Sequence, residues 1–198
     1  MRQAELMDAG LELFLSTGYE KTTVQDIVKK VSVAQGTFYY YFTSKEALLE
    51  AIYARYAKNM VIHIQSDVTA LEKLQLLINH FYKLCYDGEP GLLAAVLYRE
   101  KQGELINKVW RQLHLIAAPL FRAILEQGNQ EGVTQVTHVD ETLAFFAGII
   151  AALLEASSPL EFGHESDPSI IKNKLAIAEK LIATLFGTPP GKIHFLRE

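Results

Sequence analysis

Hydrophobic residues recur at intervals of three or four positions along nearly the whole chain, which is the spacing of amphipathic helices. The first such segment, residues 2–17, carries this pattern at Leu6, Ala9, Leu13 and Phe14. The same spacing predicts helices over residues 24–31, 35–42, 45 onward, 68–86, 90–102, 104–130, 139–157 and 168–186. No stretch alternates apolar and polar residues for long enough to predict a sheet. The pattern therefore predicts an all-α protein.

Glycine and small polar residues mark the predicted ends of the first helices. Gly18 falls where a left-handed residue would end the first helix. Thr22 and Thr23 are both competent N-caps for the second helix, and Thr22 has the capping-box spacing to Gln25. Ser44 can cap the fourth helix in the same way. These signals predict three short helices followed by a long one.

The second and third predicted helices are joined by a turn at residues 32–34. Two helices in this arrangement form a helix-turn-helix, whose second helix enters the major groove of DNA. Phe38 and Phe42 are expected to face inward, because they share one side of the third helix. The outer face then consists of Gln35, Gly36, Thr37, Tyr39 and Tyr40, with Tyr41 at its edge.

Residues of this outer face suit contact with DNA. The Gln35 amide can pair bidentately with adenine, and Gly36 permits close approach of the backbone. The Thr37 hydroxyl can reach phosphate oxygens, and Tyr40 offers its ring to thymine methyl groups. Lys45 adds a cation for phosphate at the start of the fourth helix. The competing interpretation of the tyrosine run is half-buried packing.

The overall charge does not suggest a nucleic-acid binder, but its distribution does. The chain of 198 residues carries a net charge of −4. Between residues 21 and 45, four lysines stand against the single acid Asp26, which gives a local charge of +3. Within this segment Lys29 and Lys30 are also consistent with a solvated face. A basic footprint on an acidic protein fits DNA contact by one small module.

Residues 6–50 resemble the N-terminal domain of the TetR family of transcriptional regulators. The resemblance rests on LMDAGLELFLSTGYEKTTVQDIV, on GTFYYYF and on the SKEALL that opens the next helix. It implies a helix-turn-helix DNA-binding domain over residues 1–46 and a ligand-binding and dimerisation domain over residues 47–198. It also implies DNA contacts at the positions Gln35, Thr37, Tyr39, Tyr40, Tyr41 and Lys45, and at either Thr22 or Thr23.

The implied function is that of a repressor released from a palindromic double-stranded DNA operator by a small hydrophobic or aromatic effector. The turn departs from the family's Gly-Val-Ser at two positions. Ser32 must adopt a conformation that glycine adopts more easily, and Ala34 cannot supply a side-chain cap. These departures keep an alternative open, in which the chain is an all-α small-molecule sensor that no longer binds DNA.

The later helices are longer and more apolar, and Pro119 is expected to kink or break one of them. Residues 143–154 are apolar around the whole helix, so every side of it must be covered. By the resemblance, this helix and the last one would form a homodimer. The competing interpretation is packing inside the monomer. The candidate dimerisation residues are Phe146, Ile150, Leu153, Ile171, Leu175, Ala178, Leu181, Ile182 and Leu185.

A ligand pocket is expected in the middle helices, where aromatic and polarisable side chains gather. The candidates are Phe81, Cys85, Tyr98, Trp110, His114, Phe121, Phe145 and Phe162. Trp110 and His114 are the preferred pair, because a spacing of four places them on one helix face. Pockets and cores are built from the same residue types, so ordinary packing is the competing interpretation for each.

Composition and motifs argue against other functional classes. The longest uncharged apolar run has 12 residues, short of the ~20 that span a bilayer, so a soluble cytoplasmic protein without a membrane partner is expected. No catalytic motif and no paired metal-ligating residues occur, so we expect no enzyme activity, metal or cofactor. A single cysteine, Cys85, excludes an intrachain disulfide, and redox sensing is the alternative to an inert core thiol.

Overall fold

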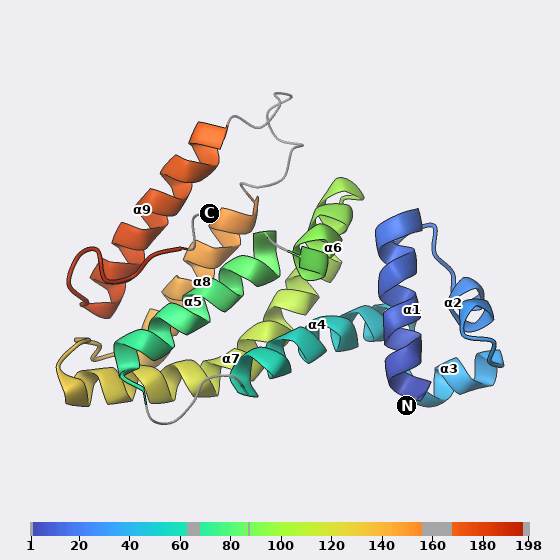
Figure 1. The fold of residues 1–198 in the computed structure, drawn as a ribbon, viewed down its shortest axis with the longest axis horizontal. Helices are drawn as coiled ribbons and strands as arrows, with labels where there is room; N and C mark the ends of the chain where they lie inside the picture. The colour runs from blue at the N-terminus through green and yellow to red at the C-terminus, as the bar shows by residue number, and fades with distance from the viewer. Residues whose placement is uncertain (1, 63–67, 87, 156–167, 196–198) are drawn as a thin grey trace.

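The computed structural model describes residues 2–62, 68–86, 88–155 and 168–195, which form nine helices and no strand. The all-α prediction is therefore confirmed. Figure 1 shows α1, α2 and α3 grouped at one end of an elongated molecule and α9 at the other. The helices are α1 (Arg2–Thr17), α2 (Val24–Lys30), α3 (Gln35–Tyr41), α4 (Lys45–Ile62), α5 (Ala70–Tyr86), α6 (Gly88–Arg99), α7 (Gly103–Glu131), α8 (Val139–Glu155) and α9 (Pro168–Phe186).

A first hydrophobic core joins the three N-terminal helices to α4. Phe14, Ile27 and Phe38 come from α1, α2 and α3 and are fully buried in it. Leu48 and Leu49 of α4 belong to the same core, because the first turns of α4 pack against α1. Side chains of α6 and of the first half of α7 complete it. This core therefore crosses residue 46 and fixes α1–α3 to the rest of the molecule.

A second core lies among α5, α7, α8 and α9. Phe121, Phe146 and Phe186 are its large buried aromatic side chains. Helix α7 is long enough to enter both cores, with its first half in one and its second half in the other. Tyr98 and Trp110 are partly buried against both cores. The junction of the two cores is thus marked by an aromatic pair from α6 and α7.

Ser44 and Pro119 affect α4 and α7 in different ways. Ser44 caps α4, since the Ala47 backbone N–H donates to its hydroxyl oxygen at 3.1 Å. Pro119 lies inside α7 without breaking it. Figure 1 shows the α7 ribbon changing direction along its length, so of the two predicted outcomes, a kink or a break, the helix bends and does not break. Packing on both sides of the helix explains why it continues, since each half is held by its own core.

Candidate functional site

The start of α2 is organised by Thr23. The Asp26 backbone N–H donates to the Thr23 hydroxyl oxygen at 3.1 Å, and the Thr23 N–H donates to the Asp26 carboxylate at 2.9 Å. This is a capping box, and its hydrogen bonds hold the pKa of Asp26 below its usual value. The predicted capping box of Thr22 with Gln25 is therefore wrong by one residue.

Thr22 has a different role. Its side chain is 1% exposed, and its hydroxyl donates to the Gly18 carbonyl oxygen at 2.6 Å. A buried hydroxyl that already has a partner cannot reach a phosphate, so the structure corrects the candidate DNA contact at Thr22. Thr23 is exposed and remains the candidate. The difference follows from the loop after α1, which turns Thr22 inward beneath Gly18.

The turn between α2 and α3 forms despite its two unusual residues. Ser32 adopts the left-handed region with φ of 55°, as expected of a residue that replaces glycine. Ala34 provides no side-chain cap, yet the Thr37 N–H donates to the Ala34 carbonyl at 2.9 Å and α3 begins at Gln35 as predicted. The departures from the family pattern therefore leave the helix-turn-helix geometry intact.

Helix α3 separates its aromatic side chains into two faces. Phe38 is fully buried and Phe42 nearly so, which anchors the helix on the first core. The exposed fractions are 52% for Tyr39, 81% for Tyr40 and 36% for Tyr41. Gln35 and Gly36 are exposed beside them, whereas Thr37 is half-buried. The result is a protruding aromatic and amide surface on an anchored helix, which has the shape of a DNA-reading element.

Lys45 does not point outward from this surface. Its ammonium donates to the carbonyl oxygens of Tyr19 at 2.5 Å and Thr22 at 2.8 Å, and it lies 4.2 Å from the centre of the Tyr19 ring. Burial lowers the pKa of Lys45, while Glu100, Glu20 and Glu46 oppose that shift. The lysine predicted to bind phosphate thus holds the loop between α1 and α2 on the start of α4.

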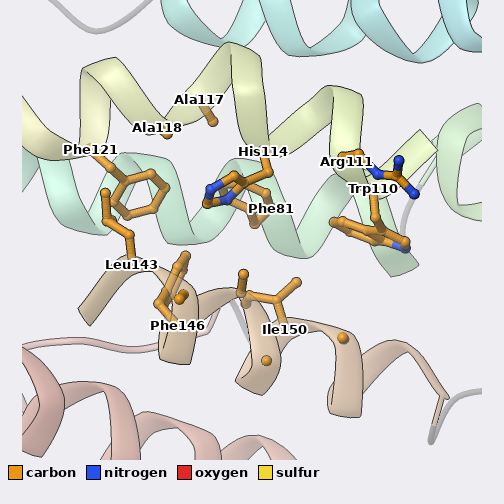
Figure 2. Close-up of a pocket in the computed structure, with 14 residues that line it drawn as sticks. Phe81, Trp110, Arg111, His114, Ala117, Ala118, Phe121, Leu143, Phe146 and Ile150 are labelled. Carbon is orange, nitrogen blue, oxygen red and sulfur yellow. The ribbon is translucent and has the colours of Figure 1, made fainter. Parts of the chain in front are cut away.

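A pocket with a volume of about 410 Å³ lies between α5, α7 and α8 (Figure 2). We call it the α7–α8 pocket. Four predicted ligand residues line it, namely Phe81, Trp110, His114 and Phe121. Figure 2 shows Phe121 with Leu143 at one end and Trp110 with Arg111 at the other. Rings of Phe81, Phe121 and Phe146 contact one another, with the Phe121 and Phe146 centroids 4.8 Å apart.

The remaining ligand candidates lie elsewhere. Tyr98 does not line this pocket but borders a neighbouring hollow. Phe145 is 70% exposed on the opposite side of α8, so its assignment to the pocket is wrong. Phe162 and the side chain of Cys85 lie outside the described residues. Arg111 also lines the pocket and was not among the candidates named from the sequence. Its position directly after the candidate Trp110 could have indicated it.

The exposed apolar surface of α8 and α9 also differs from the prediction. Phe146 and Ile150 line the α7–α8 pocket instead of a dimer surface. The side chains of Leu175 and Ile182 are buried in the second core, and that of Ile171 is outside the described part of the chain. The exposed residues are Phe145 at 70%, Ile177 at 58% and Leu181 at 50%, together with Ala144, Gly148 and Ala152.

These six residues form what we call the α8–α9 face. A hollow of about 470 Å³ runs along it, with Leu153 and Ala178 among its lining residues. Of the predicted dimerisation residues, Leu181 is half-exposed here and Leu185 is half-buried. The predicted stripe was displaced because α8 is apolar on every side, so helical periodicity alone could not select its outward face.

Two other kinds of site are absent from the described residues. No helix in them is long and apolar enough to cross a membrane. Within the same ranges, no three side chains of histidine, cysteine, aspartate or glutamate converge as metal ligands.

A helix with exposed tyrosines, anchored in a helix-turn-helix and joined to a larger helical domain, defines the class of helix-turn-helix transcriptional regulators. The family described as bacterial regulatory proteins, tetR family, matches residues 6–52. The fatty acid metabolism regulator protein of Bacillus subtilis (strain 168) is 30% identical over 133 residues, covering 65% of this chain and 68% of that protein. The chain therefore belongs to the TetR family and is a DNA-binding transcriptional regulator, not an enzyme.

Solved structures agree with this fold. The fatty acid degradation regulator FadR of Bacillus halodurans matches with a TM-score of 0.61 at 20% identity, over 93% of this chain and 94% of that one. The regulator RolR in complex with resorcinol matches with a TM-score of 0.66 at 16% identity, over 93% of this chain and 91% of that one. At such identities the likeness establishes the shared architecture.

Proposed function

We propose that the protein is a dimeric repressor that binds a palindromic operator through α3 and leaves it when a small hydrophobic or aromatic effector enters the α7–α8 pocket. The observation that carries the DNA-binding part is Tyr40. Its side chain is 81% exposed, while Phe38 on the same short helix is fully buried. Together with Tyr39 and Tyr41, Tyr40 forms a contiguous exposed aromatic patch on an anchored helix, and such patches mark interaction sites.

The proposed contacts divide by chemistry. Gln35 and Tyr40 would contact base edges. Gly36 would let the backbone come close to DNA, because it has no side chain and faces open space, where an added Cβ would meet no atom within 4 Å. The hydroxyl groups of Thr23, Thr37, Tyr39 and Tyr41 would bind phosphate oxygens and set the register. Lys45 would act indirectly, by positioning the loop that presents Thr23.

Dimerisation through the α8–α9 face would place two copies of α3 on one side of the assembly. Phe145, Ile177 and Leu181 supply apolar area, and the small side chains of Ala144, Gly148 and Ala152 permit close approach of a second pair of helices. A two-fold dimer reads a palindrome whose half-sites lie about 34 Å apart. The exposed apolar side chains of the α8–α9 face support a homodimer.

The effector part of the proposal rests on the pocket's position. Helix α7 lines the pocket and packs along α4, whose first turns carry α1–α3. A ligand that displaces α7 would move α4 and change the separation of the two α3 helices. The B. subtilis relative is a fatty acid metabolism regulator, and RolR was solved with resorcinol, which supports an apolar or aromatic effector here.

The test uses DNA from the region upstream of the gene, with fluorescence anisotropy as the readout. Wild-type protein should bind with a strong salt dependence, and Tyr40→Ala should weaken binding by roughly 5- to 150-fold, the equivalent of ~1–3 kcal/mol for one base contact. Leu92→Ala is the matched control, because Leu92 is 60% exposed on α6, away from α3. Equal binding by both variants would instead favour a sensor that does not read DNA through α3.

The effector is tested separately with Ala147→Phe, which places a ring in the pocket from α8. This variant should keep its DNA affinity and lose release by apolar compounds such as naphthalene. If naphthalene released both proteins equally, the α7–α8 pocket would not be the effector site. The proposed DNA contacts would then stand without the proposed effector site.

A further inference from the structure

A second hollow adjoins the α7–α8 pocket at its Trp110 end. It has a volume of about 330 Å³ and lies where α6 meets α7. Trp110 and Ala151 line both spaces, so the two adjoin at these side chains. We call the second space the Lys101 hollow, after a residue that lines it. Figure 2 shows Trp110 at the end of the pocket opposite Phe121, and Trp110 also lines the second space.

The two spaces differ in polarity. The α7–α8 pocket is walled mainly by aromatic rings, aliphatic side chains and alanines. The Lys101 hollow adds Gln102 and Asn107, whose amides can donate hydrogen bonds. Among the described residues that line either space, the charged side chains are Arg111 and Lys101, and none is acidic. An apolar space that adjoins a space lined by a cation and amides fits an amphiphile of negative charge.

We propose that the two spaces form one channel for a single elongated ligand, whose apolar body lies between α5, α7 and α8 and whose anionic head lies against Lys101 and Gln102. The length of the channel supports this. Its lining residues on α7 run from Gly103 to Phe121, roughly 27 Å at 1.5 Å per residue. This inference rests on the proposed effector function, which it deepens by naming the class of ligand.

The head site has a direct connection to the DNA-binding helices. The Gln102 amide donates to the Glu20 carboxylate at 2.6 Å, and the Glu20 backbone N–H donates to the Glu100 carboxylate at 2.9 Å. We call these three residues the Glu20 latch. Glu20 belongs to the loop between α1 and α2, so the latch ties that loop to the turn between α6 and α7.

An anionic head would oppose this latch. A head that accepts a hydrogen bond from Gln102 takes the donor from Glu20 and stands close to the Glu20 carboxylate. The two like charges repel, so the Gln102–Glu20 hydrogen bond should weaken when the hollow is filled. A neutral head of the same size would compete for the amide without that repulsion. Charge on the ligand therefore decides how strongly binding loosens the latch.

The test measures Trp110 fluorescence in the full-length protein, since the chain has one tryptophan. The titrants are decanoate and 1-decanol, which share a chain length and differ in head charge, both below their aggregation concentrations. Wild-type protein should bind decanoate more tightly than 1-decanol. Lys101→Gln should weaken decanoate binding about fivefold, the upper range for an exposed ion pair, and leave 1-decanol unchanged. Arg99→Gln, a nearby exposed cation that lines neither space, should change neither titration.

A second readout is amide hydrogen exchange at residues 18–22. Decanoate should speed exchange there at least twofold, because the Glu20 N–H loses protection when the latch opens, and 1-decanol should have a smaller effect. Equal affinity for the two compounds, no effect of Lys101→Gln, or no binding of decanoate would each overturn the proposal.

Naphthalene separates this proposal from the effector function on which it rests. It can fill the α7–α8 pocket but carries no head group for Lys101. Naphthalene binding without any preference for decanoate would overturn the anionic head site and leave the effector pocket in place. A decanoate preference that depends on Lys101, in a protein whose DNA affinity never responds to any ligand, would support the channel and contradict the effector function.

Discussion

The Lys45 ammonium lies 2.5 Å from the Tyr19 carbonyl oxygen and 4.2 Å from the centre of the Tyr19 ring. This contact joins the first residue of α4 to the loop between α1 and α2. It replaces an expected phosphate contact with an internal one. The geometry of the DNA-reading unit thus depends on a lysine that faces the protein.

Lys45→Ala should therefore destabilise the protein by about 1–3 kcal/mol, because carbonyl oxygens lose a charged donor. DNA affinity should fall while the dependence of log affinity on log salt stays unchanged, since no phosphate contact is lost. Thermal unfolding and a salt titration of DNA binding measure the two effects. Lys29→Ala is the control, because Lys29 is exposed on α2. A lower salt slope for Lys45→Ala would show that Lys45 does bind phosphate.

The capping box of α2 predicts a dependence of stability on pH. The pKa of Asp26 is lowered by its hydrogen bonds to Thr23, so the contribution is present above the unfolded-state pKa of about 3.9 and is lost as the pH falls through the lower folded value. Thr23→Ala should cost about 1 kcal/mol at pH 7. The gap between wild type and the variant should narrow below pH 4 in denaturant unfolding. A constant gap would mean that the Asp26 charge is not involved.

Ile177→Glu should convert a dimer to a monomer, because it buries a charge in the proposed α8–α9 interface. Sedimentation or light scattering measures the change. Leu115→Glu tests the specificity of the effect, since Leu115 is 63% exposed on α7 and should leave the assembly intact. A monomeric wild type would remove the basis of the dimer proposal.

Phe146→Ala should act differently, with a loss of ~3–5 kcal/mol in stability, because Phe146 is 3% exposed in the second core.

Gly18→Ala tests the contact between the α1–α2 loop and Glu100. A Cβ at Gly18 would lie 2.3 Å from the Glu100 carboxylate oxygen, in a residue whose φ is +100°. Gly132→Ala is matched for positive φ, at +71°, but its Cβ would meet no atom within 4 Å. Both variants should lose about 1–2 kcal/mol from backbone strain. Gly18→Ala alone should also increase amide exchange at residues 100–102, and an equal response from both would argue against the contact.

Local sequence signals were sufficient for the helices and for the helix-turn-helix. Phe38 and Phe42 were placed inward correctly because the third helix has one apolar side and one polar side. The start of α3 at Gln35 was also predicted, despite Ala34. Such patterns depend on neighbours three or four residues apart, so the chain itself contains the information.

Tertiary structure decided the features that depend on distant contacts. The sequence offered both Thr22 and Thr23 as caps, and only the packing of the loop beneath Gly18 buried one of them. It offered Lys45 as a cation, and only the position of Tyr19 turned the ammonium inward. In α8, an apolar residue occupies every side, so the pocket, the core and the outer face were distinguished by what α5, α7 and α9 cover. The sequence alone thus determined where this protein forms helices and its helix-turn-helix, while long-range packing determined which side chains lie in the cores, line the pocket or stay exposed.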